Sequence, residues 1–105
     1  MVLEINTESF NREVISESGV VIVDFFANWC GPCRKLAPIL EEVETELGSK
    51  VKFAKINTDE NIEMAKQYQV SGLPTLMVFK NGEAVERIVG LMPKSSIITN
   101  IEKHI

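Results

Sequence analysis

The chain has 105 residues, 45% hydrophobic and 25% charged, which is typical of one globular domain with its own apolar core, here expected over residues 1–105. The formal net charge of −4, from 15 acidic and 11 basic side chains, argues against binding to nucleic acid, which requires several Lys or Arg residues on one face. No stretch has the pattern of a membrane span or a secretory signal, so we expect no membrane association. Two cysteines in a domain that can fold without them fit a reducing compartment, and we therefore expect a cytoplasmic protein.

The first part of the sequence predicts a strand, a helix and a second strand. Residues 2–5, VLEI, are a short strand candidate, and Asn6 or Thr7 can cap a helix whose apolar residues follow at helical spacing. Residues 20–27, VVIVDFFA, are apolar on both alternating faces. That pattern is expected of a central strand in a parallel sheet with helices on both sides.

The middle of the chain continues the alternation. After the cysteines, apolar residues recur at steps of four, three and four up to Gly48. Pro38 lies inside this pattern and predicts one kinked helix rather than two separate helices. Residues 51–56, VKFAKI, predict a third strand, and residues 58–68, TDENIEMAKQY, a third helix with acidic residues in its first turn.

The last part of the chain changes to antiparallel pairing. Asn81-Gly82 separates two apolar stretches within residues 74–90, which is the strongest short signal of a β-hairpin. A final helix follows Pro93, and His104 near its end should be solvated. This order of elements predicts an α/β sandwich in which four α-helices flank a central mixed five-stranded β-sheet.

Cys30 and Cys33 lie at the carboxyl end of a central strand, where open α/β sheets usually place their chemistry. A zinc site needs four ligands, and the chain offers two thiols and His104, so we expect no metal within one chain. A structural disulfide over so short a loop stabilises a fold by only about 2 kcal/mol. A metal shared between two chains and a structural disulfide stay open as alternatives to a redox dithiol, which explains the position directly.

A helix that begins near Gly31 or Pro32 places the sulfur of Cys30 beside unpaired N–H groups and the positive end of the helix dipole. Both favour the thiolate, which is the nucleophile in disulfide exchange. Cys33, one turn further on, should point back toward Cys30 and be the more buried of the two. We therefore predict that Cys30 attacks and Cys33 resolves.

The sequence around the cysteines resembles the thioredoxin family, and the resemblance runs nearly from end to end. VDFFANWCGPCRKLAPIL, KINTDEN and YQVSGLPTLMVFKNGE stand in the order and spacing of that family. The resemblance implies the thioredoxin fold and a general protein-disulfide oxidoreductase that reduces client disulfides by dithiol-disulfide exchange.

The resemblance also implies how the dithiol is restored. Cys30 would form a mixed disulfide with the client, Cys33 would release the reduced client, and a separate reductase, most often an NADPH-dependent flavoprotein, would reduce the pair again. The chain has no Gly-rich dinucleotide fingerprint, so no nicotinamide or flavin cofactor is expected in it. We expect it to be a monomer.

Asp24 lies in the middle of the most apolar strand, where a buried carboxylate is costly unless it is paired or used. Either a buried water or a backbone donor satisfies it, or it accepts the proton of Cys33, which is the role that the resemblance implies. Desolvation should raise its pKa. Lys55 is either an exposed strand lysine or, as the resemblance implies, a neighbour that modulates the charge of Asp24.

A flat apolar docking surface beside the dithiol is a further implication of the resemblance. Pro74 would follow a cis peptide bond, although X-Pro bonds are mostly trans, and the backbone of Leu73 would pair with an extended client. The other members of this surface would be Trp29, Gly31, Pro32, Gly72, Gly90 and Leu91, whose glycines could equally serve ordinary turns.

Two residues should modify this chemistry. Pro32 has no N–H, which removes one donor that could stabilise the Cys30 thiolate and should make the pair a stronger reductant. Phe26 departs from the family pattern, which usually has Trp there, so an indole N–H is lost while apolar packing is kept.

Two other functions compete with the reductase. One is a thioredoxin-fold binding or chaperone subunit whose dithiol is incidental. The other is a glutathione-linked oxidoreductase, a class that usually has Pro-Tyr rather than Gly-Pro between its cysteines. The motif from Trp29 to Cys33, together with Asp24 and Pro74, favours the reductase.

Overall fold

The computed structural model describes residues 1–105 and forms one five-stranded sheet flanked by helices. The strands are β1 (Leu3–Ile5), β2 (Val20–Phe26), β3 (Val51–Asn57), β4 (Thr75–Lys80) and β5 (Glu83–Val89). The helices are α1 (Thr7–Phe10), which continues into the π-helical turn η1 (Asn11–Ile15), α2 (Gly31–Leu47), α3 (Ile62–Gln67) and α4 (Lys94–Glu102). The predicted fold is confirmed.

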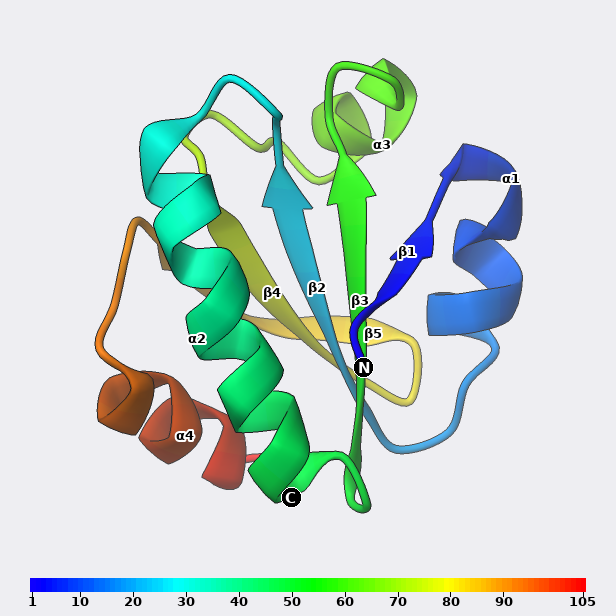
Figure 1. Ribbon diagram of the computed structural model, residues 1–105. Coiled ribbons are helices and arrows are strands. Elements are labelled where there is room, and N and C mark those ends of the chain that lie inside the picture. The colour runs from blue at the N-terminus through cyan, green and yellow to red at the C-terminus, as the bar shows by residue number, and fades with distance from the viewer.

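The sheet has the order β1-β3-β2-β4-β5, so β2 lies at its centre (Figure 1). β2 is parallel to β3 and antiparallel to β4, β1 is parallel to β3, and β5 is antiparallel to β4. The sheet is therefore mixed, and its parallel half carries the carboxyl end of β2 from which the cysteine motif continues.

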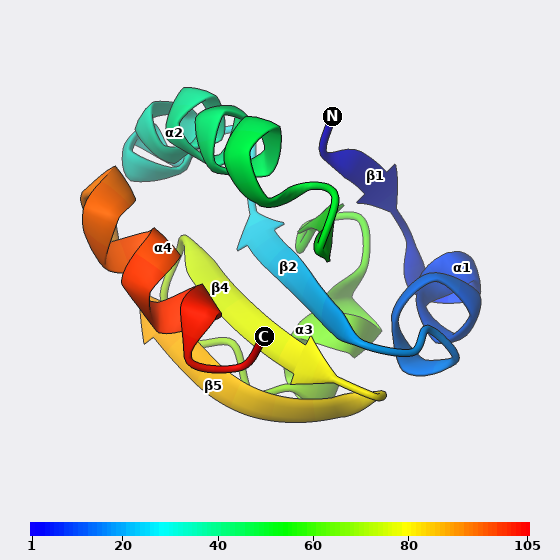
Figure 2. The same ribbon diagram turned by 90° about the horizontal axis from the view of Figure 1, so that it is seen from below.

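The apolar side chains of β2 alternate between two cores because successive residues of a strand face opposite sides of the sheet. Val20 and Ile22 pack with residues of α2 and α4, whereas Val21 and Val23 pack with residues of α1, η1 and α3. Figure 2 shows α2 and α4 together on one side of the sheet. Asp24 follows the same alternation and faces α2, the helix that carries Cys33.

A helix cap and a hairpin turn form as their residues predict. Asn6 caps α1, since its side chain accepts the N–H of Ser9 at 2.9 Å. Asn81 and Gly82 have φ angles of 51° and 85°, the left-handed values that a two-residue hairpin turn requires. They join β4 to β5 as an antiparallel pair.

The helix predicted over residues 58–68 is shorter than expected. The side chain of Asn57 accepts the N–H groups of Asp59 at 2.9 Å and Glu60 at 3.3 Å, which closes a turn after β3. This side chain competes with helical hydrogen bonding, so α3 begins only at Ile62.

α2 and α4 lie together on one side of the sheet, whereas α3 packs against the other side. α2 continues through Pro38 without interruption, and α4 follows Pro93.

The prediction of a solvated His104 is wrong, because its Nε2 lies 2.8 Å from Glu86 of β5 and its side chain is only 21% exposed. None of the helices combines the length and apolar character that crossing a bilayer requires.

Candidate active site

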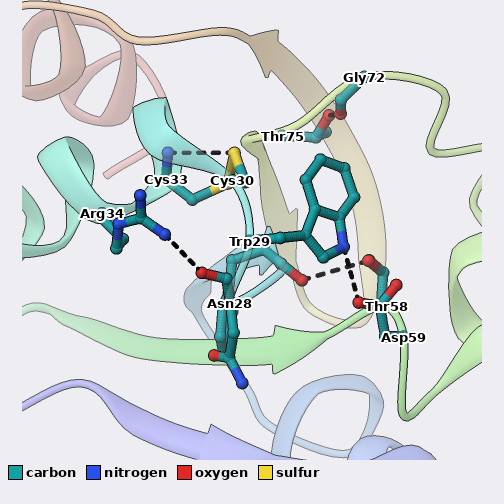
Figure 3. Close-up of a disulfide and its surroundings, with 10 residues drawn as sticks. Asn28, Trp29, Cys30, Cys33, Arg34, Thr58, Asp59, Gly72 and Thr75 are labelled. Atoms are coloured by element: carbon teal, nitrogen blue, oxygen red, sulfur yellow. Dashed lines mark hydrogen bonds between the residues drawn. A yellow bond between two sulfur atoms is a disulfide. The ribbon is translucent and has the colours of Figure 1, made fainter.

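Cys30 is the N-cap residue of α2 (Figure 3). Its backbone is extended, and its Sγ accepts the backbone N–H of Cys33 at 3.2 Å. Pro32, at the second position of the helix, has no N–H to add. Because N-cap side chains accept from the second or third helical residue, Cys33 supplies the one donor of this kind. The predicted position of Cys30 at the start of the helix is confirmed.

Cys30 and Cys33 form a disulfide with their Cα atoms 5.2 Å apart. Both residues are 4% exposed, so the expectation that Cys33 is the more buried is wrong for this state. Phe26 and Leu73 pack against the small apolar cluster that contains the two cysteines. With this packing, both cysteines are buried to the same extent.

Asp24, Cys33 and Lys55 line one cavity of about 160 Å³. Asp24 is 3% exposed, and its Oδ1 atom has no hydrogen-bond partner. It lies directly beside Lys55 in the register of β2 with β3, and Arg34 completes the charged groups of the cavity. The ammonium of Lys55 also lies 5.8 Å from the centre of the Phe26 ring. The carboxylate that the sequence places in an apolar strand therefore shares a cavity with a cysteine and a lysine.

Burial of the carboxyl raises the pKa of Asp24 to about 7, and the positive charge of Lys55 opposes part of this rise. The predicted direction is confirmed. Since no protein group donates to Oδ1, a backbone donor does not offset the desolvation of the carboxylate at this atom. A carboxyl group with such a pKa can exchange a proton near neutral pH.

Trp29 projects into solvent next to the disulfide, with 69% of its surface exposed. Its indole N–H donates to Asp59 at 2.8 Å, and the guanidinium of Arg34 donates to the backbone carbonyl of Asn28 at 2.7 Å (Figure 3). These two bonds hold both sides of the loop that leads into Cys30.

A groove of about 450 Å³ is lined by Cys30 but not by Cys33, and it shares no lining residue with the Asp24 cavity. Five of its lining residues come from the cysteine motif and the predicted docking surface, namely Trp29, Cys30, Gly31, Pro32 and Leu73. The other four, Thr58, Ala65, Val70 and Ser71, were not predicted as site residues. They come from the loop before α3, from α3 itself and from the segment after it, and none of them carries a group that takes part in disulfide exchange.

The rest of the predicted docking surface lies beside the groove rather than in its lining. The Leu73-Pro74 peptide bond is cis, as the resemblance implied. The N–H of Gly90 donates to the carbonyl of Pro74 at 2.8 Å. The hydroxyl of Thr75 donates to the carbonyl of Gly72 at 2.6 Å (Figure 3). Leu91 follows Gly90 and is 43% exposed.

No three His, Cys, Asp or Glu side chains lie together in a way that could hold a metal ion. The chemistry that the structure offers is that of the disulfide itself. A reducible cysteine pair at the amino end of the helix after the central strand, with an apolar groove beside it, defines a thiol-disulfide oxidoreductase of the α/β sandwich class.

Comparison with known proteins specifies the class. The family model described as thioredoxin matches residues 1–103. The chain is 45% identical over 104 residues to the thioredoxin of Bacillus subtilis, with 99% of this chain and 98% of that protein covered. It is 42% identical over 102 residues to thioredoxin 1 of Nostoc sp., with 97% and 95% covered, and 44% identical over 97 residues to thioredoxin 1 of Synechococcus elongatus, with 92% and 91% covered. The chain belongs to the thioredoxin family.

Family membership and the cysteine pair together fix the activity. The chain is a protein-disulfide reductase that works by dithiol-disulfide exchange through Cys30-Gly31-Pro32-Cys33. Its substrates are proteins that contain disulfides, and its partner is a reductase that returns the pair to the dithiol. An incidental dithiol on a binding subunit is not favoured.

The substitution Asp24→Asn should stabilise the oxidised protein at neutral pH. The pKa of Asp24 is about 7 in the folded state and about 4 in an unfolded chain. The folded state therefore holds the proton more tightly, and wild type loses stability as the pH rises from about 4 to about 7. The variant does not lose stability in this way. The difference in the free energy of unfolding between the variant and wild type should therefore grow over that range and reach at most about 4 kcal/mol above pH 7.

Urea unfolding at a series of pH values, with the disulfide intact, measures this difference. Glu102→Gln, at an exposed position of α4, is the matched control and should change the free energy of unfolding little at any pH. A difference between Asp24→Asn and wild type that stays constant with pH would contradict the deep burial of this carboxyl.

The substitution Pro32→His should make the pair a stronger oxidant. It restores an N–H at the second helical position, which can donate to the Cys30 thiolate and stabilise the reduced form. One such bond should raise the reduction potential by about 30 mV. A redox titration against dithiothreitol measures the potential. Lys35→His is the control, because it adds the same side chain but no new backbone N–H. An equal or lower potential in Pro32→His would refute this account.

Proposed function

We propose that this chain is a general reductant of protein disulfides in which Cys30 attacks the client and Cys33 resolves the mixed disulfide. The observation that carries this assignment is the different surroundings of the two sulfurs. Cys30 lines the apolar groove, whereas Cys33 lines the cavity with Asp24 and Lys55. A client can reach the groove, and a proton acceptor is available in the cavity.

In the first step, the Cys30 thiolate attacks one sulfur of the client disulfide. A bond forms between Cys30 and that sulfur, the client disulfide breaks, and the other client sulfur leaves as a thiolate. The position of Cys30 at the N-cap of α2 supports this role, because the backbone N–H of Cys33 and the helix dipole stabilise the thiolate.

In the second step, Cys33 attacks the sulfur of Cys30. The Cys30–Cys33 disulfide forms, the mixed disulfide breaks, and the client leaves with both of its sulfurs reduced by the two electrons of the pair. We assign Asp24 as the acceptor of the Cys33 proton, and Lys55 as the neighbour whose charge lowers the pKa of that carboxyl. The cavity that these residues share supports both assignments.

Clients dock, in this proposal, on the surface formed by Trp29, Gly31, Pro32, Gly72, Leu73, Pro74, Gly90 and Leu91. Its exposed apolar members, Trp29 and Leu91, support contact with an unfolded or extended segment. The backbone of Leu73, next to the cysteine cluster, is a candidate partner for an extended client strand.

The proposal also covers the domain organisation, the oligomeric state, the cofactor and the cellular location. Residues 1–105 act as one thioredoxin domain, supported by the family match over residues 1–103. The protein needs no bound cofactor, because the cysteine pair itself carries the electrons, and it works as a monomer. It operates in the cytoplasm, where the redox poise keeps dithiols reduced, and an NADPH-dependent flavoprotein restores it.

Cys30→Ser should lose the ability to accelerate insulin reduction by dithiothreitol, because the attacking sulfur is gone. Reduced Cys33→Ser, mixed with insulin after removal of dithiothreitol, should instead accumulate a covalent complex through Cys30, since the resolving sulfur is missing. Insulin turbidity and non-reducing electrophoresis measure the two outcomes. Catalysis by Cys30→Ser equal to wild type would leave only a binding role, and trapping by Cys30→Ser rather than Cys33→Ser would reverse the assigned roles.

A further inference from the structure

The segment from Gln69 to Pro74 forms one wall of the groove, yet it lies outside every helix and strand. Three of the contacts that hold it come from residues beyond α3. The hydroxyl of Thr75 binds the carbonyl of Gly72, and the N–H of Gly90 binds the carbonyl of Pro74. The third contact holds the start of the segment and comes from a side chain of β5.

That side chain is Arg87. Its guanidinium donates to the backbone carbonyl of Gln69 at 3.2 Å through Nη1, and to that of Tyr68 through Nη2. These carbonyls lie at the carboxyl end of α3, where helical partners are lacking and the dipole favours a cation. Gln69 has a φ of 53°, the left-handed conformation that ends a helix. One planar guanidinium therefore binds the two carbonyls at the point where the chain leaves α3.

β5 and the residue that follows it thus support the groove wall from both ends. Arg87 binds the beginning of the segment, and Gly90 binds Pro74 at its end. Between them, Val89 lies close enough to touch any side chain that replaced Gly72, since a Cβ there would lie 3.2 Å from its Cγ1. Arg87 itself does not line the groove, so it acts on the groove only through the backbone it holds.

We propose that Arg87 is a positioning residue for client docking: by binding the end of α3 it fixes Val70, Ser71 and Leu73 against Trp29. This inference rests on the proposed function, in which protein clients dock in the groove. It predicts a defect specific to protein disulfides. A small disulfide reaches Cys30 without the groove wall and should not respond to Arg87.

The test mixes the reduced protein with excess insulin and follows oxidation of the dithiol by the fluorescence of Trp29. Arg87→Met should raise the half-saturating insulin concentration roughly three- to tenfold, the effect of losing one or two hydrogen bonds, with the limiting rate little changed. Its rate with hydroxyethyl disulfide should equal that of wild type. Arg87→Lys, which keeps the charge and can donate to one carbonyl, should recover part of the loss.

Lys80→Met is the matched control, because it removes an exposed positive charge from the far end of β4. It should behave as wild type with both substrates. Equal half-saturation for Arg87→Met and Lys80→Met overturns the inference, as does an equal slowing with insulin and with hydroxyethyl disulfide. A defect that disappears in high salt also overturns it, because it would then reflect attraction of insulin by an exposed charge.

Amide hydrogen exchange provides the structural readout. The N–H of Val70 binds the carbonyl of Ala65 at 2.9 Å, and this bond should open more often when Arg87 is lost. Exchange at Val70 should therefore become faster in Arg87→Met while the core strands remain protected. Unchanged exchange at Val70 overturns the inference. Failure of wild type to reduce insulin would instead remove the proposed function on which it rests.

Discussion

The sulfur of Cys30 caps the amino end of α2, and the site depends on this one position. The backbone N–H of Cys33 donates to it at 3.2 Å, which ties the two cysteines to the same helical turn. The position requires the helix to begin immediately after the loop from β2, and Gly31-Pro32 allows this start. It also requires β2 to be central, so that a buried strand delivers the loop to a defined place at the edge of the sheet.

The placement gives the disulfide two different sides. Toward the α2 core, Cys33 meets a cavity with Asp24 and Lys55, where a carboxyl group with a pKa of about 7 can exchange a proton. Toward solvent, Cys30 meets an apolar groove beside Trp29. Proton transfer at Cys33 and client docking at Cys30 can therefore proceed in two separate hollows. In the proposed mechanism, this separation lets the second thiol ionise while the client still occupies the groove.

Local sequence signals predicted the parts of this arrangement that depend on neighbouring residues. The alternation in β2, the turn at Asn81-Gly82 and the motif around Cys30 each depend on a few adjacent positions, and each was predicted correctly. The groove wall depends on distant pairs instead. Arg87 binds Tyr68 and Gln69 across 19 and 18 residues, and nothing near Arg87 in the sequence indicates such a contact. The cis bond before Pro74 was expected only from the family resemblance, because local preference favours trans. Equal burial of the cysteines arises from packing by Leu73, which is likewise remote in sequence.

Alkylation of the reduced protein tests most directly whether the amino end of α2 holds a reactive sulfur. At mildly acidic pH, free cysteine is almost entirely protonated and reacts slowly with iodoacetamide. We expect Cys30 to be carboxamidomethylated much faster than free cysteine under these conditions and Cys33 not to be, so that peptide mapping finds the label on Cys30. If neither sulfur reacts faster than free cysteine, or if Cys33 takes the label first, the N-cap position does not activate Cys30.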